Sequence, residues 1–522
     1  MRRELMLAAL EADRVWDFLV IGGGATGLGI AVDAAARGYT VALAEAEDFA
    51  KGTSSRSTKL VHGGVRYLQQ GNVALVMDAL RERGLLRRNA PHLVHDLAFV
   101  VPSYEWWESP FYGIGLKVYD LLAGEYGFGA SSHLSQDEVR ATIPTIETLG
   151  LRGGTRYYDG QFDDARLAVH LALTAADRGA VLVNYCPAVG LLKDGSGRVA
   201  GARLNDRESG REFAVAARAV INATGPFADG LRRLDHPDSP PVIAPSQGSH
   251  VVLDREFLPG TSAIMVPHTD DGRVMFAIPW HHRVILGTTD VPTAGVPGEP
   301  TPTRAEIDFI LDTANRYLTR DAGYSDIRAV FAGIRPLVRA GDGSTAALSR
   351  DHSILIDPLS GLMTVAGGKW TTYRRMAEDA VDLAATLAAL PSRSCPTREM
   401  PLHGHDPEAA RHGPLAPYGS DAPAILALQR QRPELASPLV AGLPATGAEV
   451  VWACRTEMAR TVEDALSRRT RSLLFDAHAA IAAAPAVARL MANELGRDDP
   501  WQADQVASFG TLAAGYLPPP AG

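Results

Sequence analysis

The sequence predicts an α/β protein that comprises a Rossmann-like dinucleotide-binding domain, an α+β lobe and a small helical domain near the C-terminal end. The chain begins with an apolar run at residues 16–21, then glycines, an alanine-rich stretch at 25–37 and a second apolar run at 41–43, which is a strand–helix–strand pattern. Short β-rich runs surround one helical stretch between residues 237 and 339. Beyond residue 422, the stretches 449–471 and 476–495 have helical spacing.

These patterns predict a discontinuous first domain. We assign residues 1–75, 150–235 and 340–390 to the dinucleotide-binding domain, and residues 76–149 and 236–339 to a substrate-binding, or cap, lobe. Residues 391–422 are rich in Pro, Gly, His and Ser and are predicted to be a linker, and residues 423–517 form the helical domain. Several units are expected because domains usually contain about 100–200 residues, whereas this chain has 522.

Composition argues against several classes of protein. A formal net charge of −9 gives no overall attraction to nucleic acid or anionic lipid. The three cysteines lie far apart and form no CxxC pair, which argues against a disulfide framework and a zinc site and favours a reducing cytoplasm. We predict no metal site. No run of about 18 apolar residues is present, so any membrane contact is expected to be peripheral.

A glycine fingerprint lies between the first strand and the first helix. Gly22, Gly24 and Gly27 satisfy the pattern G-x-G-x-x-G, and Glu45 follows the next strand. Such glycines let the backbone approach a pyrophosphate at a helix N-terminus, and the carboxylate of Glu45 can accept hydrogen bonds from ribose hydroxyls. A purely structural glycine turn is the alternative. The position, the flanking elements and Glu45 together favour a dinucleotide site, but the fingerprint does not separate NAD from FAD.

Two later strand ends favour FAD. Residues 221–225 and 365–369 each join an apolar strand to glycines, at Thr224-Gly225 and at Gly367-Gly368-Lys369. The second segment opens a helix whose dipole can stabilise negative charge at the flavin N1/C2=O edge. A one-lobe NAD enzyme does not need these segments. Either of them alone is equally well explained as an ordinary tight turn.

The loop after the fingerprint carries a long motif. Residues 52–68, Gly-Thr-Ser-Ser-Arg-Ser-Thr-Lys-Leu-Val-His-Gly-Gly-Val-Arg-Tyr-Leu, closely resemble the signature of FAD-dependent glycerol-3-phosphate dehydrogenases of the bacterial aerobic type. Further matches follow in family order at residues 163–166, 222–226, 248–250, 287–290, 333–337, 349–351, 367–374 and 465–471. The resemblance covers nearly the whole chain. It implies bound FAD, oxidation of sn-glycerol 3-phosphate to dihydroxyacetone phosphate by hydride transfer, and a quinone acceptor.

The implied substrate sets requirements for the site. Its phosphate dianion needs at least two fixed cations, and its secondary alcohol needs a base beside flavin N5. Arg66, Arg335, Arg350 and Lys369 lie in matching motifs, with Tyr67 next to Arg66. A solvated surface charge is the alternative for each cation. Glycine and proline flank Arg335 and two glycines precede Lys369, which favours direct substrate or flavin contact for these two.

Two histidines compete as the base. His62 and His250 each lie in a glycine-containing motif, and an imidazole titrates near neutral pH. A structural histidine is the alternative for either. We favour His62 because the family motif places it beside the flavin loop. Ser54, Ser55 and Thr58 are expected to bond FAD, although hydroxyls in such loops often only cap a turn.

Aromatic and aliphatic side chains crowd residues 102–122, around Trp106 and Trp107. We favour a buried core or a lid over the site. The alternative is a patch that enters lipid headgroups and admits a quinone. The resemblance implies a cytoplasmic protein bound peripherally to the inner face of the cell membrane. The expected partners are glycerol 3-phosphate and membrane quinone but no nucleic acid, and a homodimer is left open.

Two other functions remain open from the sequence. A glycerol-3-phosphate oxidase would keep the substrate and reduce oxygen. The chain lacks the long insertion that the resemblance implies for many such oxidases. A non-catalytic, flavin-binding regulatory protein belongs to a different class, and the arginine and lysine motifs argue against it.

Overall fold

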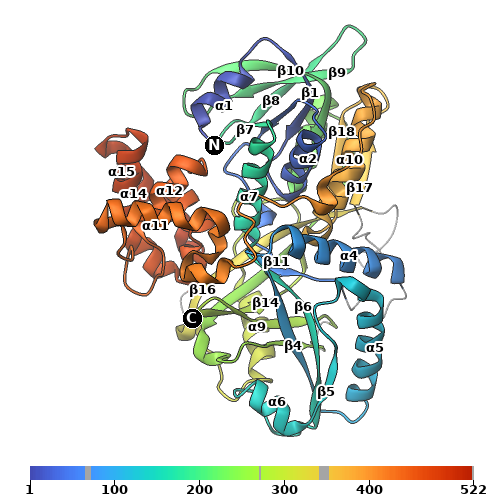
Figure 1. Cartoon of the computed structure of the whole chain (residues 1–522), viewed down its shortest axis with the longest axis vertical. Helices are drawn as coiled ribbons and strands as arrows, with labels where there is room; N and C mark the ends of the chain where they lie inside the picture. The colour runs from blue at the N-terminus through green and yellow to red at the C-terminus, as the bar shows by residue number, and fades with distance from the viewer. Residues whose placement is uncertain (65–71, 268, 270–271, 340–351, 520–522) are drawn as a thin grey trace.

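The computed structural model describes residues 1–64, 72–267, 269, 272–339 and 352–519. In Figure 1 one lobe lies at the top, a second lies at the bottom, and the C-terminal helices lie against their junction. Among the described residues, the α-helices are α1 (Arg3–Leu10), α2 (Ala25–Ala36), α4 (Val73–Asn89), α5 (Glu108–Ala123), α6 (Gln136–Thr142), α7 (Asp164–Asp177), α8 (Ala228–Asp235), α9 (Arg304–Asn315), α10 (Tyr373–Leu387), α11 (Ala422–Gln431), α12 (Gly447–Thr456), α13 (Ser472–Phe475), α14 (Ala477–Leu495) and α15 (Asp499–Ala514).

The upper lobe is built on a largely parallel sheet with strand order β17-β18-β10-β1-β2-β7. Its strands are β1 (Val15–Ile21), β2 (Val41–Ala44), β7 (Val181–Val183), β8 (Ala188–Lys193), β9 (Val199–Asn205), β10 (Glu212–Asn222), β17 (His352–Ile356) and β18 (Met363–Gly367). β1 runs parallel to β2 and β10, and β10 runs parallel to β18, so the carboxyl ends of these strands meet at one edge. The predicted Rossmann-like fold is confirmed.

The packing of α2 explains its composition. This alanine-rich helix lies close to α10, because a Cβ on Gly29 would come within 2.9 Å of the ring of Tyr373. Both helices, together with α7, contribute to one buried core with β1 and β2. Small side chains on α2 therefore let two helices approach closely while the apolar strand beneath them is buried on both faces. This arrangement holds the start of α2 at the carboxyl end of β1.

The lower lobe combines two distant stretches of the chain in one sheet, β15-β11-β14-β13-β12-β4-β6-β3, with β16 on β11 and β5 on β6. Its strands are β3 (Leu60–Val61), β4 (Val94–Ser103), β5 (Ser132–Leu134), β6 (Gly153–Phe162), β11 (Ile243–Asp254), β12 (Ala263–Val266), β13 (Met275–Trp280), β14 (Arg283–Gly287), β15 (Val291–Pro292) and β16 (Ile327–Val338). β6 pairs with β4 over ten residue pairs. It therefore belongs to this lobe, although we expected residues 150–235 in the upper one.

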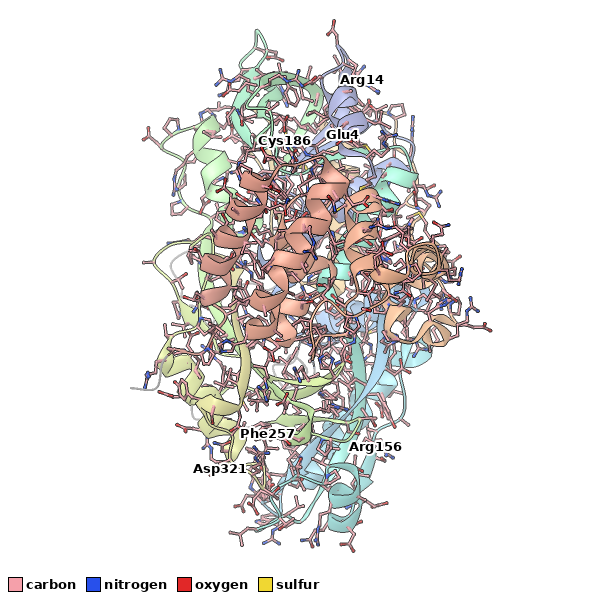
Figure 2. The ribbon with its side chains drawn as sticks, turned by 90° about the vertical axis from the view of Figure 1, so that its left-hand side faces the viewer. Glu4, Arg14, Arg156, Cys186, Phe257 and Asp321 are labelled. Atoms are coloured by element: carbon pink, nitrogen blue, oxygen red, sulfur yellow. The ribbon has the colours of Figure 1, made fainter. Side chains whose placement is uncertain are left out.

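The C-terminal helices span the junction of the lobes. Figure 2 shows them facing the viewer, between the end marked by Cys186 and the end marked by Phe257. The helix predicted at 449–471 is interrupted, because α12 ends at Thr456 and a π-helix, η11 (Asp464–Arg469), follows. Met458 and Arg471 adopt left-handed backbone angles that an unbroken α-helix does not allow. α15 was not predicted.

The segment predicted as a linker, residues 391–422, is packed against the rest of the chain. Leu402, Leu415 and Tyr418 are buried. The backbone amide of Leu402 donates to the carbonyl of Asn89 on α4, at 3.0 Å. The composition of this segment therefore reflects tight turns between contacts rather than an extended tether.

Candidate active site

One large cavity, of about 1220 Å³, is lined from both lobes and from α15. Ligand pockets usually measure about 300–1,000 Å³, so this cavity can hold a dinucleotide together with a small substrate. Most of the predicted site residues that the structure describes line it: Gly22, Gly24, Glu45, Ser54, Thr58, His62, Thr224, Gly225, His250, Arg335, Gly367, Gly368 and Lys369. The structure thus brings together residues that are as many as 347 positions apart, from Gly22 to Lys369.

The glycine fingerprint has the geometry that a pyrophosphate site requires. Gly22 has a φ of +111°, and a Cβ at this position would come within 2.5 Å of the carbonyl oxygen of Ala223. Gly27 lies beneath the cavity wall, where a Cβ would come within 1.9 Å of the Gly22 carbonyl oxygen. Only glycine fits at either position. The first turn of α2 therefore closes directly onto the cavity, as an anion site at a helix N-terminus requires.

Glu45 is held in place by two backbone amides. Its Oε2 accepts from the amide of Gly23 at 2.5 Å, and its Oε1 accepts from the amide of Glu47 at 2.8 Å. Burial raises the pKa of this carboxyl above its usual value, while the two amide donors oppose the rise. The side chain lines the cavity near the end of β2, where the carboxylate of a dinucleotide fold meets ribose.

The hydroxyls of the loop after β2 bind mainly to protein. Ser54 Oγ accepts from the amide of Ala25 at 2.9 Å and so caps the start of α2. Thr58 Oγ1 lies 2.9 Å from His250 Nε2. Ser55 does not line the cavity, and its carbonyl accepts from Lys59 Nζ at 2.9 Å. Ser54 and Thr58 still line the cavity, so their polar atoms form part of its surface, although Ser54 also caps α2 and Thr58 also contacts His250.

The loop after β18 forms another part of the cavity wall. Gly367 and Gly368 have φ angles of +74° and +78°, and a Cβ on Gly368 would come within 2.3 Å of the sulfur of Met376. These left-handed angles turn the chain so that Lys369 lines the cavity. Trp370 Nε1 donates to the carbonyl of Ser54 at 3.0 Å. This hydrogen bond gives Trp370 a structural role that the sequence did not indicate, since it joins the two loops.

Arg335 is fixed at the lower-lobe side of the cavity. Its Nη1 donates to Asp290 Oδ1 at 3.2 Å, and its Nη2 donates to Thr288 Oγ1 at 3.1 Å and to the carbonyl of Thr289 at 3.0 Å. A Cβ on Gly248 would come within 2.4 Å of Nη2, so glycine there makes room for the guanidinium. Arg335 is therefore held in place at the cavity, and its contact with the substrate or flavin stays a prediction.

The two candidate bases differ in their surroundings. His250 is buried, stacks on Phe331 with ring centroids 4.5 Å apart, and has Nε2 next to the Thr58 hydroxyl. Burial, and then the positive charges of Lys59 and Arg335, lower the pKa of His250 well below its usual value. His62 lies at the cavity wall with its side chain half-buried.

Three predicted site residues, Arg66, Tyr67 and Arg350, lie outside the described residues. Arg273 and Asp290 are among the cavity residues to which sequence reasoning assigned no role. Arg273 lines the cavity just before β13, and Asp290, although quoted in a motif, was given no role. The only signal for Arg273 in the sequence was its position directly before a strand that faces the site. Without knowing how the strands pair, the sequence does not distinguish such an arginine from a surface charge.

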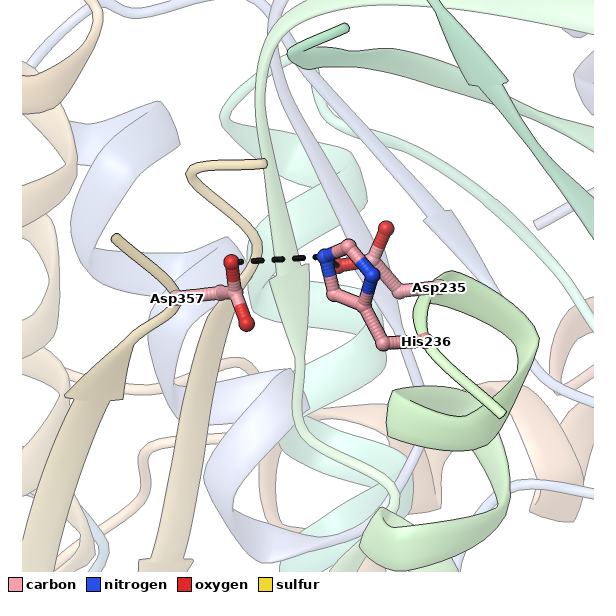
Figure 3. A group of neighbouring side chains, drawn as sticks. All are labelled: Asp235, His236 and Asp357. Carbon is pink, nitrogen blue, oxygen red and sulfur yellow. Dashed lines mark ion pairs between the residues drawn. The ribbon is translucent and has the colours of Figure 1, made fainter. Parts of the chain in front are cut away.

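Among the described residues, one group could bring metal-ligand atoms together, namely Asp235, His236 and Asp357, whose ligand atoms lie within 4.8 Å of one another. Figure 3 shows His236 between the two carboxylates. Lys193 Nζ already lies 2.8 Å from Asp235 Oδ1, and the hydroxyl of Ser360 donates to Oδ2. An ammonium group therefore already offsets the charge of Asp235, and none of the three lines the cavity.

The comparison with protein families decides the class of the protein. The family described as FAD dependent oxidoreductase matches residues 17–374. The chain belongs to this family. The C-terminal domain of alpha-glycerophosphate oxidase matches residues 362–502, which include α11, α12 and α14. Family membership confirms the predicted FAD cofactor, and the glycine geometry above fits its pyrophosphate.

Curated relatives share much of the sequence. A mitochondrial glycerol-3-phosphate dehydrogenase of Macaca fascicularis is 42% identical over 97% of this chain and 74% of the relative. The mitochondrial glycerol-3-phosphate dehydrogenase SDP6 of Arabidopsis thaliana is 40% identical over 94% of this chain and 85% of the relative. The predicted resemblance to the glycerol-3-phosphate dehydrogenase family is confirmed.

Solved structures agree with the sequence relatives. A glycerol-3-phosphate dehydrogenase from Bacillus halodurans, complexed with FAD, has a TM-score of 0.81 at 30% identity and aligns over 100% of this chain and 98% of that one. An L-proline dehydrogenase from P. horikoshii has a TM-score of 0.56 at 17% identity over 77% of this chain, and it shows the fold alone. The first alignment includes the C-terminal helical domain, whereas the second covers only part of the chain.

Proposed function

We propose that this chain oxidises sn-glycerol 3-phosphate to dihydroxyacetone phosphate, with hydride transferred to FAD and electrons passed to a membrane quinone. The observation that carries the proposal is the convergence of Arg335, Lys369 and His62 on the cavity that bears the dinucleotide fingerprint. An anionic alcohol needs this combination of cations and a base. The named relatives at about 40% identity support the same substrate.

The roles follow from the surroundings of each side chain. Arg335 presents a fixed guanidinium to the phosphate group, and Lys369 adds a second positive charge from the loop after β18. His62 takes the proton of the C2 hydroxyl. His250 is the poorer base, because its pKa is strongly lowered and its Nε2 already faces Thr58. Bound FAD supplies a two-electron acceptor for the hydride from C2.

The helix α5 supports peripheral attachment to a membrane. We define the α5 stripe as Trp106, Trp107, Phe111, Ile114, Val118 and Leu121. These side chains are exposed, Trp106 to 75%, Ile114 to 70% and Leu121 to 82%, and from Trp107 onward they recur every three or four residues. The exposure of these side chains contradicts the favoured prediction of a buried core for this face, whereas a lid over the site stays a prediction. An apolar stripe of this kind fits an interfacial helix.

The opposite face of α5 is buried against the cavity wall. Tyr112 and Leu116 belong to the same apolar cluster as Phe99, Tyr157 and Met265, which line the cavity. The α5 stripe and the flavin cavity therefore lie on either side of one helix, which supports an acceptor that approaches from a lipid phase. Among the described helices, none is both long enough and apolar enough to cross a membrane.

The rival activity is that of an oxidase, and the match of the C-terminal domain to that of alpha-glycerophosphate oxidase favours it. One assay distinguishes the oxidase from the dehydrogenase activity. Flavin-loaded protein is given glycerol 3-phosphate with a soluble quinone or dye, and dihydroxyacetone phosphate, reduced acceptor and peroxide are measured together. We expect product to match reduced acceptor, with little peroxide and with glycerol oxidised far more slowly. Peroxide equal to product would identify an oxidase.

A further inference from the structure

A second arginine shares the carboxylate that holds Arg335. Arg273 lies in the connection before β13, and its Nη1 donates to the backbone carbonyl of Asp290 at 2.5 Å and lies 3.4 Å from Asp290 Oδ2. Arg335 Nη1 contacts the other oxygen, Oδ1, at 3.2 Å. Both side chains line the cavity and are partly exposed, 32% for Arg273 and 28% for Arg335. One carboxylate therefore ties two guanidinium groups together at the cavity surface.

The residue between the two arginines is itself held firmly. The hydroxyl of Ser246, on β11, donates to Asp290 Oδ1. The neighbouring Thr289 donates from its hydroxyl to Glu306 Oε1 at 2.7 Å, and this glutamate forms the capping box at the start of α9. The position of Asp290 is thus set by the lower-lobe sheet and a helix, and it does not depend on the two arginines alone.

A third arginine in the cavity wall, Arg56, has a structural role. Arg56 also lines the cavity, but it donates to both carboxylate oxygens of Glu299, at 2.7 and 2.8 Å, and its side chain is only 5% exposed. Arg273 lines the same cavity but differs because about a third of its side chain, 32%, is exposed. Arg273 and Arg335 thus bring two guanidinium groups to one part of the cavity surface, and guanidinium groups bind phosphate oxygens.

We propose that Arg273 is a second phosphate-binding residue, which acts with Arg335 on the substrate phosphate, and that Asp290 sets the spacing of the two guanidinium groups. This inference rests on the proposed function, because that function supplies the phosphate. Two guanidinium groups held on one carboxylate can bind different oxygens of the same phosphate, which a single arginine cannot fully neutralise. The pair would therefore select a phosphorylated alcohol over a neutral one.

The test compares Arg273→Gln and Arg273→Lys with the matched control Arg320→Gln. Arg320 lies on the same lobe, pairs with Glu256 and Asp326, and is half-exposed. Each protein is loaded with FAD, and four properties are measured: flavin content, thermal midpoint, kcat and KM for glycerol 3-phosphate, and the affinity for inorganic phosphate from its perturbation of the flavin spectrum. Glycerol oxidation serves as the phosphate-free reference.

We expect Arg273→Gln to raise KM and weaken phosphate binding by about tenfold to a hundredfold, since a charge-assisted contact is lost. Arg273→Lys should partly restore the KM and the phosphate affinity. The rate of glycerol oxidation should not change in the Arg273 variants, and Arg320→Gln should match wild type in all four properties. Unaltered KM and phosphate affinity in flavin-loaded Arg273→Gln would overturn the inference, as would equal losses with glycerol and glycerol 3-phosphate. If glycerol 3-phosphate fails to reduce the wild-type flavin, the proposed function fails, whereas the phosphate titration still tests Arg273.

Discussion

Arg469 donates from both terminal nitrogens to the carboxylate of Asp48, at 2.6 and 2.9 Å, although the two residues are 421 positions apart. The neighbouring Arg468 adds a contact of 2.6 Å from Nε. Burial alone would raise the pKa of Asp48, but the two arginines outweigh it and hold that pKa well below its usual value. Asp48 lies in the loop after β2, so the C-terminal domain holds one wall of the flavin cavity.

We therefore predict that Asp48→Asn destabilises the protein and weakens FAD retention. Breaking a buried ion pair by removing one partner costs about 3–5 kcal/mol. Denaturant unfolding and the ratio of flavin to protein absorbance measure the two effects. The control is Arg207→Gln, which removes the solvent-exposed pair with Glu47, next to Asp48 in sequence, and should cost about 0–1 kcal/mol. Similar losses in both variants would contradict this role of the C-terminal domain.

The assignment of the base predicts different effects for the two histidines. His62→Gln should lower kcat by about 10²–10⁴ with flavin content unchanged, because a positioned proton acceptor is lost. His250→Gln should mainly lower the thermal midpoint, because its ring is buried against Phe331. Pre-steady-state flavin reduction measures the chemical step directly. A greater loss of the reduction rate in flavin-loaded His250→Gln than in His62→Gln would exchange the two roles.

His403 predicts a pH-dependent contribution to stability. Its two ring nitrogens lie 2.7 Å from Asp177 and 2.9 Å from Asp421. Burial would lower the pKa of His403, but the two carboxylates raise it to about 9. A raised folded-state pKa means that the contribution is fully present below about pH 6.5 and is lost as the pH rises through about 9. This charge joins α7 to the segment that precedes α11.

The check is the difference in unfolding free energy between wild type and His403→Gln at two pH values. We expect a difference of about 1–2 kcal/mol at pH 6, after allowing for solvent screening, and a much smaller one at pH 10. Taking the difference cancels the titration of other groups that the substitution leaves unchanged. A gap that stays constant between pH 6 and pH 10 would show that His403 stabilises by packing alone.

The α5 stripe predicts binding to vesicles. Ile114→Glu combined with Leu121→Glu should abolish flotation with phosphatidylcholine liposomes, because burying each of these side chains contributes about 1.5–3 kcal/mol. Zwitterionic lipid is the suitable probe, since the acidic body opposes anionic headgroups. The matched control replaces two exposed leucines on other surfaces, Leu149→Glu with Leu359→Glu. Equal flotation of both double variants, with FAD and dye-linked activity retained, would place membrane contact elsewhere.

Local patterns in the sequence predict the upper lobe well. The turn between β1 and α2 needs glycine at Gly22 and Gly27, because a side chain at either position would collide with backbone atoms. A local requirement of this kind can be recognised from a single sequence. The motifs around Arg335 and Lys369 likewise place both on the cavity wall, where glycines give close approach. In these cases the local backbone determines the position of the functional side chain.

Long-range pairing explains what the sequence could not predict. Arg273 reaches the cavity only because β13 joins a sheet in which β12 pairs with β4, and no local pattern specifies that pairing. The contact of Arg469 with Asp48 depends on how the helical domain docks onto the loop after β2. The exposed face of α5 was misjudged for a related reason, since apolar periodicity predicts an apolar face but not whether protein covers it.

Anaerobic reduction of the bound flavin by glycerol 3-phosphate tests the central claim most directly. Purified, FAD-loaded protein is mixed with the substrate without oxygen or any other acceptor, and the absorbance band near 450 nm is followed. We predict rapid loss of this band with one dihydroxyacetone phosphate formed per flavin, and no comparable change with glycerol. A flavin band that persists at saturating glycerol 3-phosphate would contradict the assignment of this chain as a glycerol-3-phosphate dehydrogenase.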